Sequence, residues 1–222
     1  MKLNLGIAPF DYELDFTIPD VDNIGLFVAG GLDSTILLCM IIEELNNTNR
    51  TIPIHIWTCD KPPDPKNAAR IVDVIGKEYN QGFVCYDNYS VSDEAKANGV
   101  FDFEITRKVS RQFDSIALYM GANNSWEKTQ WASQTSSDKP TLSWAYPEEP
   151  HMIYPFLWML KSQMIDIYYK LNKEHLIKYT YSCSKKEHPR CNKCYSCIEA
   201  ETGFDMLGKT RPEFLEHLVI DT

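Results

Sequence analysis

The chain has 222 residues, of which 44% are hydrophobic and 24% are charged, a composition typical of a globular protein with a full core. The formal net charge of −9 argues against general nucleic-acid binding, because contacts to phosphates need lysine and arginine. No apolar run has the length of a membrane span, and the acidic residues among positions 1–20 exclude a secretory signal. We therefore expect a cytoplasmic protein.

Strands and helices are predicted to alternate along the first half of the chain, after an acidic, partly extended lead-in over residues 1–22. Apolar runs predict strands at Ile24–Val28, Ile52–Cys59, Gly82–Tyr86 and Ser115–Met120. Helical patterns predict helices at Ser34–Leu45, Lys66–Tyr79 and Phe101–Arg111. Strands separated by helices favour a doubly wound parallel α/β sheet, with a ligand at the point where the strand order reverses.

The second half of the chain is less regular. Residues Gly121–Pro150 are polar and predict a loop over a site, and Pro155–Leu171 predicts a helix-rich stretch. We expect a short extended piece at Tyr179–Tyr181 and a closing helix at Gly203–His217. The chain is thus divided into a lead-in (1–22), an α/β domain (23–172) and a C-terminal segment (173–222).

The turn after the first predicted strand is the first chemical signal. Residues 28–35 read Val-Ala-Gly-Gly-Leu-Asp-Ser-Thr, and two adjacent glycines let backbone N–H groups approach a ligand closely. The following helix points its N-terminus at the same place, which favours an anion. Ser34 and Thr35 add hydroxyl donors, and Asp33 can hold Mg²⁺ or cap the helix. This order favours a phosphate site over a plain capped turn, and it is neither a Walker A loop nor a dinucleotide motif.

Four of the seven cysteines form the second signal, in the pattern Cys183-x7-Cys191-x2-Cys194-x2-Cys197. Such clustering favours a metal over disulfides. Four thiolates suit a tetrahedral Zn²⁺ ion and leave no position for a reacting water, so the expected role is structural. An iron–sulfur cluster, which also uses four thiolates, stays open, as does the replacement of one cysteine by His188.

Three further residues are expected near the ligand. Trp57 and Thr58 close the second predicted strand, and Gly121 follows the fourth. Ligands of parallel sheets bind beyond the carboxyl ends of the strands. Trp57 and Thr58 are therefore expected to border the adenine of a nucleotide, and Gly121 to let the backbone approach it.

The glycine turn resembles the Ser-Gly-Gly-x-Asp-Ser signature of PP-loop ATP pyrophosphatases, with Ala29 at the position of the first serine. That family cleaves ATP between the α and β phosphates and moves AMP onto an oxygen of the substrate. One of its members, 7-cyano-7-deazaguanine synthase, carries a similar four-cysteine zinc site after its PP-loop domain. Residues Thr180–Cys183 and Pro155–Ile165 also resemble this synthase, and the resemblance extends over Ile24–Glu199.

The resemblance implies an ATP-dependent ligase-type enzyme that uses Mg²⁺, with ATP as co-substrate and catalytic roles for Asp33, Ser34 and Lys161. Lys161 would stabilise the charge on the leaving pyrophosphate. The expected nucleotide contacts are Ala29, Gly30, Gly31, Leu32, Asp33, Ser34, Thr35, Trp57, Thr58 and Gly121. The implied partners are a deazapurine-like small molecule and ammonia, with no membrane or direct nucleic-acid partner, in a possible homodimer.

Other functions fit the same sequence. The chain can be a PP-loop enzyme that adenylates a different carboxylate, amide or nucleobase. It can also be a nucleotide-binding module without turnover, because Ala29 lacks the hydroxyl of the signature serine. A redox enzyme on the same fold would hold iron in place of zinc.

Overall fold

A computed structural model describes residues 1–6, 11–59, 65–89, 111–121, 152–183 and 190–215. Several predictions therefore fall outside the described residues: nearly all of the Phe101–Arg111 helix, the Gly121–Pro150 loop beyond its first residue, and His188. The remaining predictions can be compared with the structure directly.

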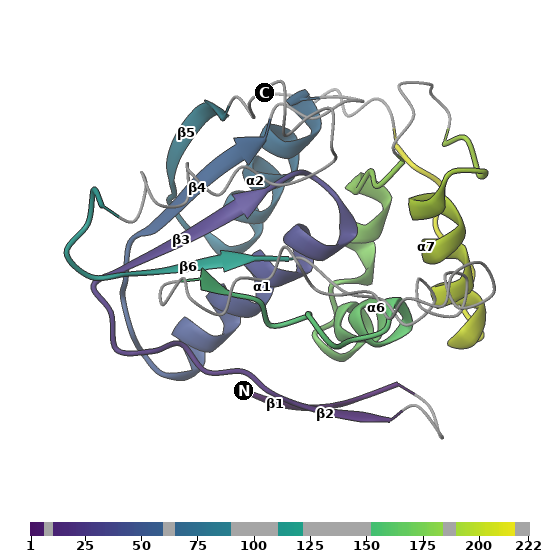
Figure 1. The fold of residues 1–222 in the computed structure, drawn as a ribbon, viewed down its shortest axis with the longest axis horizontal. Coiled ribbons are helices and arrows are strands. Elements are labelled where there is room, and N and C mark those ends of the chain that lie inside the picture. Colours follow the sequence, from purple (N-terminus) through teal and green to yellow (C-terminus); the bar gives the residue numbers. More distant parts are fainter. Residues whose placement is uncertain (7–10, 60–64, 90–110, 122–151, 184–189, 216–222) are drawn as a thin grey trace, which may run out of the picture.

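The core of the fold is a five-stranded parallel sheet in the order β5-β4-β3-β6-β7 (Figure 1). Its strands are β3 (Asn23–Val28), β4 (Ile54–Cys59), β5 (Val84–Tyr89), β6 (Ile116–Met120) and β7 (Met152–Ile153). From β3 the chain moves outward through β4 to β5, and it then returns to β6 on the other side of β3. This reversal beside β3 is the strand order of a doubly wound sheet, so the predicted fold class is confirmed.

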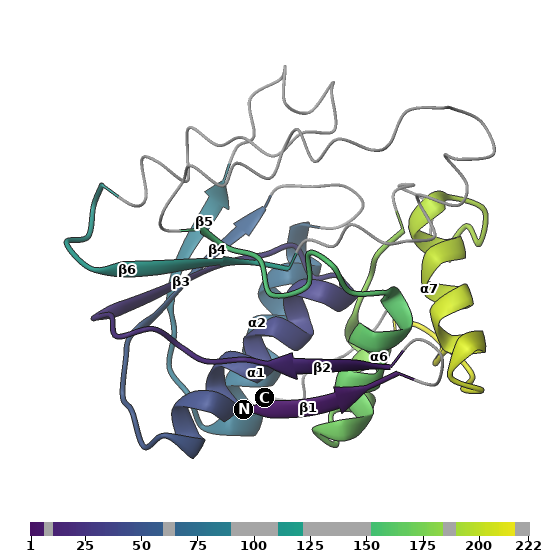
Figure 2. The same cartoon turned by 60° about the horizontal axis from the view of Figure 1, so that its bottom comes forward.

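Two helices, α1 (Leu32–Asn47) and α2 (Pro65–Tyr79), lie on the same face of the sheet (Figure 2). Helix α1 is buried on nearly all sides, which explains why its sequence is apolar with little periodicity. Alternate strand residues such as Ile24, Leu26 and Ile56 point into this core. Residues on the opposite side of the same strands, including Phe27, Trp57 and Leu118, form a second apolar cluster.

Four helices are each followed by a residue with a left-handed backbone conformation. Asn49, Asn80 and Asn172 have φ values of 51°, 50° and 55° after α1, α2 and α6 (Lys161–Lys170). Asparagine tolerates this conformation better than most residues, and the next N–H then bonds back to the last helical turn. Helix α7 (Tyr195–Met206) ends in the same manner at Gly208, with φ of 61°.

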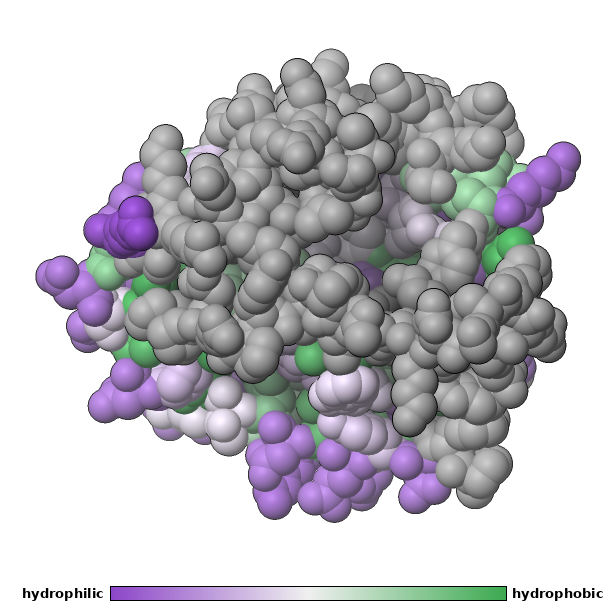
Figure 3. Space-filling model, in the orientation of Figure 1, coloured by the Kyte–Doolittle hydropathy of each residue, from purple (hydrophilic) through white to green (hydrophobic). Residues whose placement is uncertain are grey.

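The predicted lead-in contains an antiparallel hairpin, β1 (Lys2–Leu5) and β2 (Tyr12–Asp15), that runs along the lower edge of the molecule (Figure 1). Its inward residues, such as Leu5 and Leu14, join the main core. Its outward residues are hydrophilic and colour the lower rim of the space-filling view (Figure 3). Among the described helices, none combines the length and the hydropathy that crossing a membrane requires.

Two local predictions in the C-terminal third were wrong. The closing helix expected at Gly203–His217 is α7, which begins at Tyr195, directly after the N-cap residue Cys194, and ends at Met206. The cysteine loop therefore starts this helix, and the left-handed Gly208 stops it. Tyr179, expected to be extended, is the last residue of the 3-10 helix η1 (Glu174–Tyr179), and extended backbone begins at Thr180.

Candidate functional site

The predicted glycine turn lies at the carboxyl end of β3, beside the reversal of strand order. Gly30 has φ of 72°, and a Cβ there would lie 2.8 Å from Asn67 Nδ2, so the position requires glycine for both reasons. Gly31 is the N-cap of α1 and therefore supplies no side-chain cap. Among the described residues, none accepts a hydrogen bond from the N–H of Gly30, Gly31 or Ser34. The turn thus offers donors to an anion.

Ser34 braces this turn internally. Its hydroxyl accepts a hydrogen bond from Ala29 N at 3.3 Å and lies 3.5 Å from Gly31 O, to which it can donate. The side chain of Ser34 is buried, whereas Ala29 is exposed. Thr35 is fully buried, and its N–H donates to Gly31 O at 3.2 Å. Ala29, Gly31, Ser34 and Thr35, which were predicted to contact a nucleotide, thus lie together in one turn. Ala29 is on the exposed side of this turn.

Helix α2 and the residue that follows β6 both contact the glycine turn. Asn67, in the first turn of α2, donates from Nδ2 to Gly30 O at 2.9 Å. Gly121, directly after β6, has no room for a side chain, because a Cβ would lie 2.8 Å from Ser34 N and from the carbonyl carbon of Asp33. Gly121 therefore lies against the N-terminus of α1, and its approach to a nucleotide stays a prediction.

The C-terminal segment crosses the same turn. Tyr181 N donates to Gly30 O at 2.8 Å, and Leu32 N donates to Ser182 Oγ at 3.2 Å. These contacts join residues about 150 positions apart in the chain. The hydroxyl of Ser182 therefore satisfies the first N–H of α1, which has no partner within the helix.

Lys161, the first residue of α6, lies between two carboxylates. Its Nζ donates to Asp33 Oδ1 and Oδ2 at 2.6 and 2.8 Å, and Glu199 Oε2 lies 3.3 Å away. The side chains of Lys161 and Glu199 are only 4% and 6% exposed, against 23% for Asp33. Burial disfavours the ammonium charge, but the two carboxylates outweigh it and raise the pKa of Lys161 above its ordinary value. A charged lysine therefore stands at the edge of the glycine turn.

Close helix packing brings Glu199 to this lysine. Helix α7 lies beside α6 (Figure 1), and Gly203 of α7 lies against the first turn of α6. A Cβ at Gly203 would be 2.8 Å from Ile165 Cδ1 and 3.1 Å from both Lys161 Cγ and Ser162 N. Glu199 precedes Gly203 by one helical turn, so it lies on the same face of α7 and reaches Lys161 Nζ.

The four predicted metal ligands are brought together. The Sγ atoms of Cys183, Cys191, Cys194 and Cys197 lie within 4.8 Å of one another. Cys183 Sγ is 3.5 Å from Cys191 Sγ and 3.8 Å from Cys194 Sγ. Four sulfurs at about 2.3 Å from a tetrahedral ion are about 3.8 Å apart, so the cluster fits a four-thiolate metal site.

Two arginines brace the backbone around this cysteine cluster. Arg190 donates to Thr180 O and Pro212 O, both at 3.0 Å. Arg211 Nη1 donates to Cys197 O at 3.4 Å. The backbone around the cysteines is therefore held by guanidinium groups, in addition to any metal that the thiolates bind.

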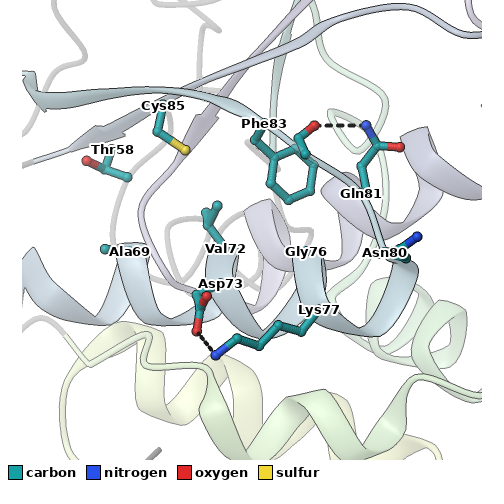
Figure 4. Close-up of a pocket in the computed structure, with 11 residues that line it drawn as sticks. Thr58, Ala69, Val72, Asp73, Gly76, Lys77, Asn80, Gln81, Phe83 and Cys85 are labelled. Atoms are coloured by element: carbon teal, nitrogen blue, oxygen red, sulfur yellow. Dashed lines mark hydrogen bonds and ion pairs between the residues drawn. The ribbon is translucent and has the colours of Figure 1, made fainter. Parts of the chain in front are cut away.

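The two residues expected near the adenine lie on opposite faces of β4. Trp57 is buried and stacks on Tyr86, with ring centroids 4.7 Å apart and ring planes 4° apart, on the face away from α1. Thr58 points to the α2 side and lines an open pocket between α2 and β5 (Figure 4). That pocket is bordered by the Asp73–Lys77 ion pair of 3.0 Å and by Cys85, and no residue of the glycine turn lines it. Contact of Trp57 or Thr58 with adenine stays a prediction.

Four residues at the site were not singled out by sequence reasoning: Asn67, Ser182, Glu199 and Gly203. Ser182 lies next to a cysteine, and Glu199 and Gly203 lie two and six residues after the last cysteine, so their nearness to the metal motif was the available signal. Asn67 carried no such signal, because it lies in an ordinary helical pattern.

Comparison with known proteins gives one family match. Residues 136–208, which include all four clustered cysteines, match the family model described as queuosine biosynthesis protein QueC. A search of curated proteins found no match.

Similar solved structures are distant. The U34-tRNA thiolase NcsA from Methanococcus maripaludis, solved with its [4Fe-4S] cluster, is 13% identical, with 87% of this chain and 69% of that chain covered and a TM-score of 0.49. NMN synthetase from Francisella tularensis is 11% identical, with 86% and 79% covered and a TM-score of 0.45. The NH3-dependent NAD synthetase from Campylobacter jejuni is 14% identical, with 89% and 91% covered and a TM-score of 0.43. At such low identity we draw no functional conclusion from them.

The family match and the glycine turn lie in different parts of the chain. The matched region carries Lys161 and the cysteines, and the turn to which Lys161 is bound lies far upstream at Asp33. Residues 136–208, about a third of the chain, are therefore similar to the queuosine biosynthesis protein QueC family.

Proposed function

We propose that this protein is an ATP-dependent adenylating enzyme similar to 7-cyano-7-deazaguanine synthase. The observation that carries the proposal is the pairing of Lys161 with Asp33 at the glycine turn, with ammonium and carboxylate 2.6 Å apart. It places a cation and a carboxylate beside backbone N–H donors at the N-terminus of α1. These are the groups that binding and cleavage of a nucleotide triphosphate need.

The residues of the chain have distinct parts in this proposal. The N–H groups of Gly30 and Gly31 would bind the phosphates, with Ser34 holding the turn in shape. Asp33 would hold Mg²⁺, which supplies charge neutralisation on the phosphates when bound. Lys161 would then face the pyrophosphate that leaves as the α–β bond breaks. The four cysteines would hold Zn²⁺ as a structural ion.

The proposed reaction begins with a carboxylate on a deazapurine. A carboxylate oxygen attacks the α phosphorus of ATP, which forms an acyl adenylate and releases pyrophosphate. Ammonia displaces AMP and gives an amide, and a second adenylation of the amide oxygen, followed by loss of AMP and a proton, gives the nitrile. The family match over residues 136–208 supports this substrate class.

The test is one reaction with two variants. Purified protein is incubated with ATP, Mg²⁺, ammonium and 7-carboxy-7-deazaguanine, and products are identified by chromatography and mass spectrometry. We expect AMP together with the amide or nitrile. Ser34→Ala removes the hydroxyl that braces the turn and should lower the rate at least about tenfold. Ser115→Ala is the matched control, because Ser115 lies just before β6, at the opposite end of the sheet.

Absence of AMP and product, from folded protein that binds ATP and carries metal, would contradict the proposed substrate. AMP formation with a different acceptor would support an adenylating enzyme acting on another compound. ATP binding without AMP release for every acceptor tried would indicate a nucleotide-binding module without turnover. Metal analysis of the same sample distinguishes zinc from iron.

A further inference from the structure

The cysteine cluster is connected to the glycine turn on its N-terminal side. Tyr181 and Ser182 directly precede the first ligand, Cys183, and both bond to the turn through Gly30 O and Leu32 N. A shift of Cys183 would therefore be passed to the start of α1 through two consecutive residues.

A second connection runs from the other end of the cluster. Cys197 lies in the first turn of α7, and Glu199 follows it two residues later. Glu199 Oε2 is 3.3 Å from Lys161 Nζ, which in turn bonds Asp33. The metal ligands fix the beginning of α7, so they also fix the position from which Glu199 reaches the lysine.

Glu199 has a particular importance once a nucleotide binds. In the proposed function, on which this step rests, Asp33 turns toward Mg²⁺ and gives up part of its contact with Lys161. Glu199 is 6% exposed and is the second carboxylate on that lysine, so it remains as the buried partner that holds the ammonium in place. Without its charge, Lys161 would follow Asp33 instead of facing the phosphates.

We infer that Glu199 is a positioning residue for Lys161 and couples metal occupancy at the four cysteines to nucleotide binding at the glycine turn. The coupling acts in both directions, because a ligand that tightens the binding of another is itself bound more tightly in return. A bound nucleotide should therefore help the cysteines to retain their metal.

The structure allows the link to be removed without removing the cluster. Arg190 and Arg211 hold the backbone around the cysteines independently of Lys161. Glu201 gives a matched control, since it lies on α7 two residues from Glu199 and hence about 200° around the helix. Its side chain is 57% exposed and lies 4.0 Å from Arg211.

The experiment measures zinc retention at equilibrium. Zinc-loaded protein is titrated with a chelator, with and without Mg²⁺ and an ATP analogue that has a methylene bridge between its α and β phosphates. In the wild type and in Glu201→Gln, the analogue should raise the apparent zinc affinity at least about fivefold. In Glu199→Gln the gain should fall below about twofold, while the variant still binds zinc. Calorimetry then gives the affinity of each protein for the analogue with and without zinc. Zinc should raise this affinity by the same factor by which the analogue raises the zinc affinity.

The zinc-retention experiment separates the coupling from the proposed function. Equal gains in Glu199→Gln and wild type, with analogue bound to both, would overturn the coupling and leave the proposed function intact. A wild-type protein that binds no analogue would contradict the proposed function, and the coupling with it. If Glu199→Gln does not fold, Ser182→Ala replaces it, because it removes one hydroxyl from the other connection and no charge. That variant should lose part of the gain, and an undiminished gain would contradict the connection.

Discussion

Gly203→Ala is the most direct test of the packing that carries Glu199 to Lys161. Alanine in a helix interior is favoured over glycine by about 1 kcal/mol, so the substitution should stabilise α7 if nothing opposed it. Here the new methyl would lie 2.8 Å from Ile165 Cδ1 and 3.1 Å from Ser162 N. The isoleucine tip can move, but the backbone nitrogen moves only with α6.

Overpacking of this kind costs about 1 to 3 kcal/mol, which exceeds the helix-propensity gain in most of its range. Subtracting the propensity gain leaves a net loss of up to about 2 kcal/mol in the free energy of unfolding, which lowers Tm by up to about 8 °C for a chain of this size. Urea unfolding of metal-loaded protein, followed by circular dichroism, gives the free energy, and a thermal scan gives Tm.

The matched control is Gly82→Ala, because a Cβ at Gly82 would meet nothing within 4 Å. It should leave Tm close to that of the wild type. A Gly203→Ala protein that is more stable than the wild type by the full propensity gain would refute the close approach of α7 to α6 on which the placement of Glu199 depends.

Three further predictions concern the turn, the metal and pH. Ala29→Ser restores a hydroxyl at the exposed side of the turn, and a hydrogen bond to a charged phosphate should tighten ATP binding roughly tenfold in calorimetry. The same change at exposed Ala69 should leave the affinity unchanged. Removal of the metal by a chelator should lower Tm by about 10 °C, and added zinc should restore it; an unchanged Tm would show that the cluster is not a structural metal site. Burial lowers the pKa of His55 below its ordinary value of 6.5, so the unfolded chain binds a proton at a higher pH than the folded protein does. Stability should therefore be lost as pH falls below 6.5, and His55→Gln should show a smaller loss between pH 7.5 and about 5.5 in urea midpoints.

The pH prediction has a geometric basis in the described residues. Asn23 Nδ2 donates to Ser115 O at 3.2 Å, which turns Asn23 Oδ1 toward His55 Nε2 at 3.1 Å. Nε2 therefore carries the hydrogen, and Nδ1 accepts from the Tyr86 hydroxyl at 3.0 Å. A neutral His55 satisfies both contacts, whereas a second ring proton at Nδ1 would require the Tyr86 hydroxyl to turn and accept instead of donate.

Local signals in the sequence were sufficient for the sheet and the two motifs. The short apolar run Ile24–Val28, followed by two glycines, located β3 and its turn, and the spacing of the cysteines located the metal cluster. Even the missed hairpin had a signal, because Leu14, Phe16 and Ile18 alternate with polar residues as a half-buried strand does. The left-handed asparagines that end three helices were equally visible as candidates and were not used.

The rest of the site depends on contacts that no local pattern encodes. Lys161 and Asp33 are 128 residues apart, and Ser182 and Leu32 are 150 apart. Glu199 lies in α7, which begins at Tyr195, eight residues before the predicted start at Gly203. The cysteine loop determines where α7 begins, and an apolar pattern does not. Strand β7 has two residues, too few for any periodicity to appear.

The crossing of the glycine turn by Tyr181 and Ser182 has a consequence for how the protein is made. A ribosome releases the turn early in synthesis, but the groups that complete it emerge some 150 residues later. Contacts so far apart in sequence form slowly, because the intervening chain must first be ordered. During synthesis the nascent N-terminal portion therefore carries an unfinished site, and it acquires its second carboxylate and its Ser182 contact only when the cysteine region joins it.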